Sequence, residues 1–442
     1  MFTSYSVNTS LIFRYDLNSI NINVTKILLK LDYNRFMKNR FKLPIITSVL
    51  LVTYVSAGDT SLLSPEKQRM YEQQQQQIDS GYEKLRYDWL SPINLKASTT
   101  YERSASTSIQ DNRQNLSAGI AQDIFRSGGI TYSIDYAESK KDADTISMHK
   151  DIAAINQQLI SNVLNFRKNT LLLEQSELKL KNGKIEIFLK RKQYEAGDID
   201  ITLLNNALMT QSSELKNNTA IRFTLSQLRL EMLKLSDRPI DTINVPTFSL
   251  IQKNDFLDEG WDFRYTQAQS RSSAQQYGQV KTSYLPKLTL SADTGLQRLN
   301  SHDLPAADYH GGFYDMGLQL SMPLTYNASA ATQEAQSLYL KQQAQAADIK
   351  RQMDGQYEQS IEHISSYQRV IAITKENLLS YGELVDATKA AVNAGYKAGY
   401  DLQTIQNTKA IEELEISINE INIQIELATL YTMTRHSQEL QL

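Results

Sequence analysis

Three aspartates follow two glycine-containing turns, and their type and spacing could do chemistry. Asp198 and Asp200 come just after Gly197, and Asp401 comes just after Gly399. Both glycines stand where two helices are expected to reverse, a place that often needs a positive φ. If several copies of the chain surround one opening, these carboxylates form rings that favour cations. The alternative is that each carboxylate caps the helix that follows it.

No catalytic motif accompanies these acids. The 442 residues contain no His-Glu-x-x-His, no glycine-rich phosphate loop and no nucleophile elbow. The absence of cysteine excludes thiol catalysis, disulfides and thiolate metal sites. His302, Asp303, Asp308 and His310 share one loop, but their irregular spacing does not favour a metal site. We therefore expect no enzyme activity, no cofactor and no bound metal.

The turns belong to a pattern that occurs twice along the chain. Each half is expected to contain a helix, two strands, a very long helix, a tight turn and a returning helix. Matched landmarks lie about 194, 199 and 202 residues apart, which is far too long for a solenoid unit. We predict a first repeat at 58–253, which ends in a linker, and a second repeat at 254–442.

Four segments of about ten residues alternate apolar and polar side chains, the period of a strand with two unlike faces. We expect strands near 93–102, 116–124, 288–297 and 314–322, with exposed loops at 104–113 and 298–312. Leu95, Ile120, Leu290 and Leu318 are expected to face lipid. A half-buried sheet of a soluble protein would alternate in the same way.

A secretory signal favours the membrane alternative. We predict a signal peptide at 37–57, with a basic start, an apolar run and small residues at the cleavage site, so that the mature chain begins at Gly58. Residues 1–36 then form a non-native or disordered extension. No other segment approaches a transmembrane helix, so membrane entry would require strands. Four strands cannot close a barrel, whereas three protomers would supply twelve.

Two proline-free regions, 130–196 and 328–396, are predicted to form long helices. Apolar residues step by three and four along them and along the returning helices, as in antiparallel coiled coils. Gly183 and Gly355 are expected to mark local irregularities. The segment 130–136 fits a strand or a helix, and its counterpart in the second half favours the helix. The alternative to a tube of helices is a hairpin inside a soluble bundle.

Short motifs resemble those of the TolC-like outer-membrane efflux and secretion channel family, over about residues 62–437. The motifs are Leu285-Pro286-Lys287-Leu288 at a strand start, Met322-Pro323-Leu324 at a strand end, Phe125 to Gly129 before a long helix, and the turns Tyr194 to Gly197 and Tyr396 to Gly399.

The resemblance implies an α+β membrane protein, internally duplicated, whose four strands per protomer form a shared trimeric β-barrel above a periplasmic helical tunnel. It implies a homotrimer in outer-membrane lipid, partnered by a periplasmic adaptor and an inner-membrane transporter, as a passive conduit for tripartite efflux or type I secretion. The net charge of −3 gives no support to nucleic-acid binding. The other function class that remains open is a secreted coiled-coil structural or adhesive protein without a pore.

One departure concerns the tunnel entrance. Some family members carry aspartate rings on the last helix, at positions that are Ile405 and Thr408 here. That constriction does not carry over. The candidates for the aperture are therefore the three aspartates or the apolar pair Leu402 and Ile405.

Overall fold

The computed structural model describes residues 62–103, 110–301 and 309–440, which lie within the compact unit Asp59–Leu442. The extension predicted at 1–36 and the signal peptide predicted at 37–57 lie outside these residues and stay predictions. Within the described residues, no helix is both long enough and apolar enough to cross a membrane.

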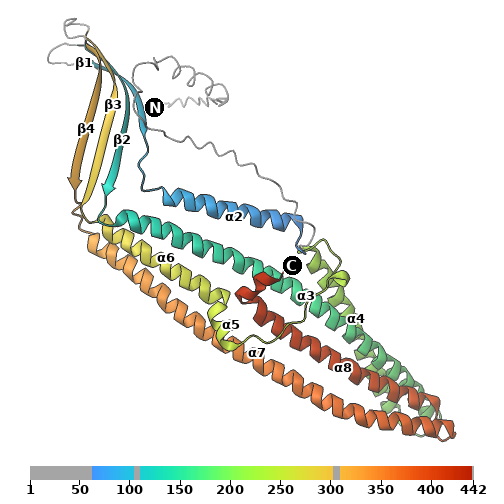
Figure 1. The fold of residues 1–442 in the computed structure, drawn as a ribbon. Helices are drawn as coiled ribbons and strands as arrows, with labels where there is room; N and C mark the ends of the chain where they lie inside the picture. The colour runs from blue at the N-terminus through green and yellow to red at the C-terminus, as the bar shows by residue number, and fades with distance from the viewer. Residues whose placement is uncertain (1–61, 104–109, 302–308, 441–442) are drawn as a thin grey trace, which may run out of the picture. The chain divides into compact units, whose positions relative to one another are not determined.

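The same order of elements occurs twice, as the duplication predicts (Figure 1). The first half contains α2 (Pro65–Arg86), β1 (Asn94–Arg103), β2 (Gln110–Phe125), α3 (Gly129–Glu195) and α4 (Ile201–Leu233). A connecting segment follows, with η1 (Ile240–Thr242) and α5 (Lys253–Glu259). The second half contains α6 (Trp261–Ser283), β3 (Lys287–Ser301), β4 (Tyr309–Ser321), α7 (Ala328–Asn393), α8 (Gly399–Thr432) and η3 (Arg435–Glu439).

The four strands form one antiparallel sheet in the order β1-β2-β3-β4. Its pairs include Leu95 with Ala118, Ile120 with Ala292, and Leu290 with Leu318. Directly paired residues lie on the same face of a sheet, as do residues two apart on one strand. Leu95, Ile120, Leu290 and Leu318 therefore share one face, as their alternation indicates.

The strands are longer than predicted, which corrects part of the loop prediction. Residues 110–113, 298–301 and 309–312 were expected in loops, but they belong to β2, β3 and β4. Polar residues on both faces carry no period-two signal there, so the strand ends cannot be recognised from hydropathy.

The two long helices are continuous, with 67 residues in α3 and 66 in α7. The irregularities expected at Gly183 and Gly355 do not interrupt them, because a single glycine costs a helix only about 1 kcal/mol. The ambiguous segment 130–136 is helical, since α3 begins at Gly129. Just before it, Ser127 (φ 49°) and Gly128 (φ 90°) are both left-handed, and they turn the chain sharply from β2 into the helix.

The helices pack side by side in a chain of contacts. Next to the sheet α2 packs on α3, α3 on α6, and α6 on α7; farther away α4 packs on α3, α3 on α8, and α8 on α7. The long helix α3 therefore lies in the interior of the array, and α4 and α7 lie at its two edges.

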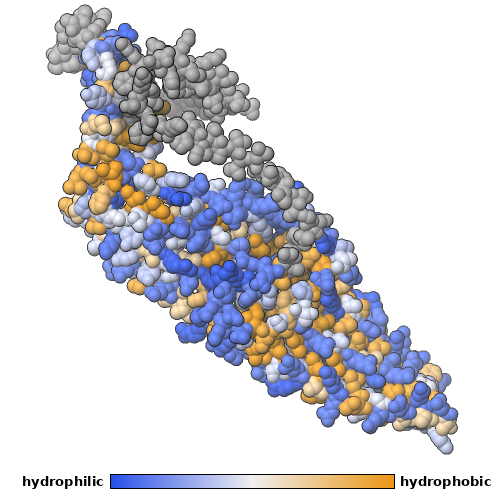
Figure 2. Space-filling view, in the orientation of Figure 1, coloured by the Kyte–Doolittle hydropathy of each residue, from blue (hydrophilic) through white to orange (hydrophobic). Residues whose placement is uncertain are grey.

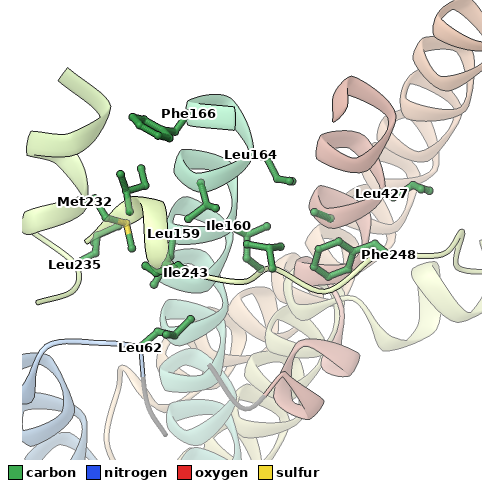
Figure 3. Close-up of a cluster of buried hydrophobic side chains, with 14 of the residues drawn as sticks. Leu62, Leu159, Ile160, Leu164, Phe166, Met232, Leu235, Ile243, Phe248 and Leu427 are labelled. Atoms are coloured by element: carbon green, nitrogen blue, oxygen red, sulfur yellow. The ribbon is translucent and has the colours of Figure 1, made fainter. Parts of the chain in front are cut away.

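The main apolar core forms where the connecting segment crosses the helices (Figure 3). Leu159, Ile160 and Val163 of α3 are buried there against Met232 of α4 and Leu427 of α8. The connecting segment adds four buried side chains, Ile240, Ile243, Val245 and Phe248. A second cluster surrounds Phe256 of α5, which is fully buried against residues of α7 and α8: Met353, Tyr357 and Leu430.

Candidate functional site

The turn between α3 and α4 closes on a left-handed glycine. Gly197 has φ 79°, and a Cβ at this position would also be strained. The N–H of Gly197 donates to the carbonyl of Tyr194, and the N–H of Asp198 reaches back to that of Gln193 at 2.9 Å. This pair of bonds is the Schellman motif, which satisfies the last carbonyls of a helix.

The turn between α7 and α8 repeats this geometry, but at Gly395 rather than Gly399. Gly395 has φ 79°, its N–H donates to Val392, and the N–H of Tyr396 reaches back to Ala391 at 2.9 Å. Gly399 is the first residue of α8 and does not have a positive φ, so its predicted role in the reversal is wrong. The Tyr-x-x-Gly spelling misled the prediction, because the chain reverses at the glycine that ends the helix.

Two of the three predicted aspartates act as helix caps. Asp200 is the N-cap residue of α4 and accepts from the N–H of Thr202 at 2.7 Å. The hydroxyl and the N–H of Thr202 lower the pKa of this exposed carboxyl. Asp401 accepts from the N–H of Ala398, the N-cap residue of α8, at 3.3 Å. Asp198 is exposed beside them. Capping leaves these carboxylates ionised, so it is compatible with a charged opening.

The apolar candidates lie on the next turns of α8. Leu402 and Ile405 are half-buried. Thr408, one turn farther on, accepts from the side chain of Asn182 of α3 at 3.3 Å. Asn407 donates to the same Asn182 side chain at 2.8 Å. Hydrogen bonds between α3 and α8 therefore stand where the family resemblance led us to look for aspartates.

Polar bonds between helices continue along α3, and sequence reasoning missed them. Gln175 is buried and donates to Glu415 of α8 at 2.9 Å. Ser176, also buried, donates to Glu214 of α4 at 2.5 Å and accepts from Asn218. Polar residues on a long helix usually indicate a solvated face. Only their recurrence at core positions of the heptad could have identified them.

The strand face is polarised as predicted. Leu95 and Leu318 are 80% and 67% exposed in the single chain. The opposite face carries polar residues such as Ser291 and Gln319, which are paired with Gly317 and Thr289. An exposed apolar face on a strand long enough to cross a bilayer is what lipid contact requires.

The comparisons with known proteins agree with this geometry. Residues 254–434 match the family model described as outer membrane efflux protein. This chain belongs to the outer membrane efflux proteins. Members of this family are channels of the outer membrane rather than enzymes, so this protein is located there as an efflux channel. This finding favours the conduit over the secreted coiled-coil alternative.

Solved structures show that the outer membrane efflux protein has the channel fold. VceC of Vibrio cholerae is 16% identical with a TM-score of 0.66, and the match covers 83% of this chain and 92% of VceC. CmeC of Campylobacter jejuni is 12% identical with a TM-score of 0.67, over 85% and 84% of the two chains. The open state of MtrE from Neisseria gonorrhoeae is 14% identical with a TM-score of 0.59, over 83% and 85%. A search of curated sequences gave no match.

A metal centre finds no support in the described part of this efflux protein. No group of three or more His, Cys, Asp or Glu residues converges within it. Of the four loop residues considered above, His302, Asp303 and Asp308 lie outside the described residues, and His310 lies in β4.

Proposed function

We propose that this outer membrane efflux protein acts as a homotrimer, the outer-membrane conduit of a tripartite efflux or type I secretion system. A periplasmic adaptor and an inner-membrane transporter would deliver the cargo, and the protein would let it pass without chemical change. The observation that carries the proposal is that the chain ends in open edges on both sides, in the sheet and in the helical array.

The sheet supports the trimer because its edges are unpaired within the described chain. β1 and β4 are the outer strands, and each offers a row of backbone donors and acceptors on one side. Unpaired backbone groups are not tolerated in lipid, and four strands are too few to close a barrel. Three copies would place β4 of one beside β1 of the next and close twelve strands.

The helical edges offer matching apolar side chains. On α4, Met209, Leu215 and Phe223 are exposed and lie 12, 18 and 26 residues past Gly197. On α7, exposed residues lie at nearly the same levels: Leu384, Leu379 and Val370 are 11, 16 and 25 residues before Gly395. If both turns lie at one level, α4 of one copy meets α7 of the next with apolar side chains at three common heights.

A disulfide between neighbouring copies tests this arrangement directly. The chain has no cysteine, so Leu215→Cys with Leu379→Cys introduces the only two thiols. A disulfide needs Cβ atoms about 4 Å apart, so rapid oxidation to a covalent trimer is expected on denaturing gels. The matched control replaces Leu379→Cys by Asn377→Cys, which is also exposed but faces another side of α7. Equal cross-linking in both variants, or none in either, would contradict the proposal.

The turn carboxylates are proposed to line the opening at the far end of the helices. Changing Asp198, Asp200 and Asp401 together to Asn removes three charges per chain and keeps the caps, since Asn caps helices as well as Asp does. We expect a lower preference for cations in planar bilayer recordings, with trimers intact. Asp237→Asn, in the connecting segment, is the control. Unchanged selectivity would leave the aspartates as caps alone and move the aperture to Leu402 and Ile405.

A further inference from the structure

The two faces of the sheet differ in charge as well as in hydropathy. The strand register assigns every described acidic residue of the strands to the face opposite Leu290: Glu102, Asp111, Asp123, Asp293 and Asp315. On the Leu290 face, the described strand residues include no Asp or Glu. The lipid-facing side of the proposed barrel is therefore free of negative charge over the described strands.

The apolar part of this face has a defined height. It runs from the pair Leu288 and Leu320, beside the helices, to the row that contains Leu116 and Leu296. These eight steps along β3 correspond to about 26 Å, close to the apolar band of about 25 Å on outer-membrane barrels before strand tilt is considered. Figure 2 shows apolar side chains over the sheet near the helices and hydrophilic ones toward the strand ends that are farther away.

The next row on the same face is basic and polar. It contains Thr99, Gln114, Arg298 and His310, each paired with its neighbour across the strands. Arg298 and His310 are exposed, and with Thr99 and Gln114 they border a hollow of about 570 Å³. Asn300 accepts from Nε of Arg298 at 3.2 Å, which orients the guanidinium while occupying one of its five N–H donors.

We propose that Arg298 and His310 bind the phosphate of an anionic lipid headgroup in the leaflet of the outer membrane farther from the helices. The inference rests on the proposed barrel, which places this row at the edge of the apolar band. A guanidinium offers phosphate two parallel hydrogen bonds, and the imidazole and the Gln114 amide can add further donors. The absence of acids on this face removes the repulsion that such a phosphate would otherwise meet.

The test compares lipid bound to intact trimers. Wild type, the double variant Arg298→Gln with His310→Gln, and Arg113→Gln are reconstituted in phosphatidylcholine nanodiscs that contain phosphatidylglycerol, and bound lipids are counted by native mass spectrometry. Arg113 is exposed and adjacent to Gln114 on β2, but on the opposite face, so it is a control at the same height with the same charge change.

We expect phosphatidylglycerol to bind about fivefold more weakly to the double variant for each cation lost, and Arg113→Gln to behave as wild type. Wild-type lipid binding in the double variant, with trimers and conductance preserved, would overturn the site. Displacement of the lipid by equimolar inorganic phosphate would also overturn it, because the site would then prefer a soluble anion. A wild-type protein that forms neither trimers nor conducting channels would instead refute the proposed barrel, and this site with it.

Discussion

Leu290→Arg and Leu318→Arg are expected to prevent assembly of the channel in the outer membrane. An arginine near the midplane on the lipid face of a barrel costs roughly 2–4 kcal/mol. Because each substitution would occur three times in the proposed trimer, the total penalty is about 6–12 kcal/mol, comparable to the whole stability of many proteins. Heat-modifiable trimers in outer-membrane extracts, seen on semi-native gels, are the measurement.

The register supplies the controls for this experiment. Ser291 and Gln319 are the next residues on the same strands, and they lie on the opposite face. Ser291→Arg and Gln319→Arg add the same charge at the same depth and should assemble normally, since that face is expected to line water. Equal behaviour of the four variants would exclude the lipid-facing assignment of Leu95, Ile120, Leu290 and Leu318.

Phe256→Ala should give the largest loss of stability among substitutions outside the sheet. Phe256 has no exposed surface, and its ring lies 5.5 Å from that of Tyr357, centroid to centroid. Removal of a buried phenylalanine side chain typically costs about 3–5 kcal/mol. We expect a clear decrease in the thermal midpoint of the detergent-solubilised protein, followed by circular dichroism of the helices.

Leu250→Ala is the matched control for this substitution. It lies in the same connecting segment but is 52% exposed, so its truncation should change the midpoint little. A similar decrease in both variants would show that the segment tolerates no change at all, rather than that Phe256 holds α5 against α7 and α8.

The strands and long helices could be predicted because their signals are periodic. Leu288, Leu290 and Ala292 alternate with polar neighbours, and a one-residue error in register would reverse their face. The long helices lack proline over more than sixty residues, so little else was compatible with their sequence.

The errors arose where short-range chemistry decides the structure. The second turn was placed at Gly399 because Tyr396 to Gly399 resembles a family motif, whereas the Schellman bonds require the left-handed glycine at Gly395. The bonds of Gln175, Ser176 and Asn182 were missed because polar side chains on a helix give no sign of what they face. Such contacts depend on the partner helix, which becomes adjacent only when the fold forms.

The equivalence of the two turns limits how this protein can evolve. The left-handed glycines are 198 residues apart, and so are the first residues of α4 and α8, Ile201 and Gly399. The strands match at a shorter spacing, so the chain has gained or lost residues around the sheet and kept the lengths of the helices. A heptad deleted from one hairpin alone would shorten it by about 10 Å relative to its twin. The two halves therefore act as rulers for each other, and length changes in the hairpins must arise in both or be eliminated by selection.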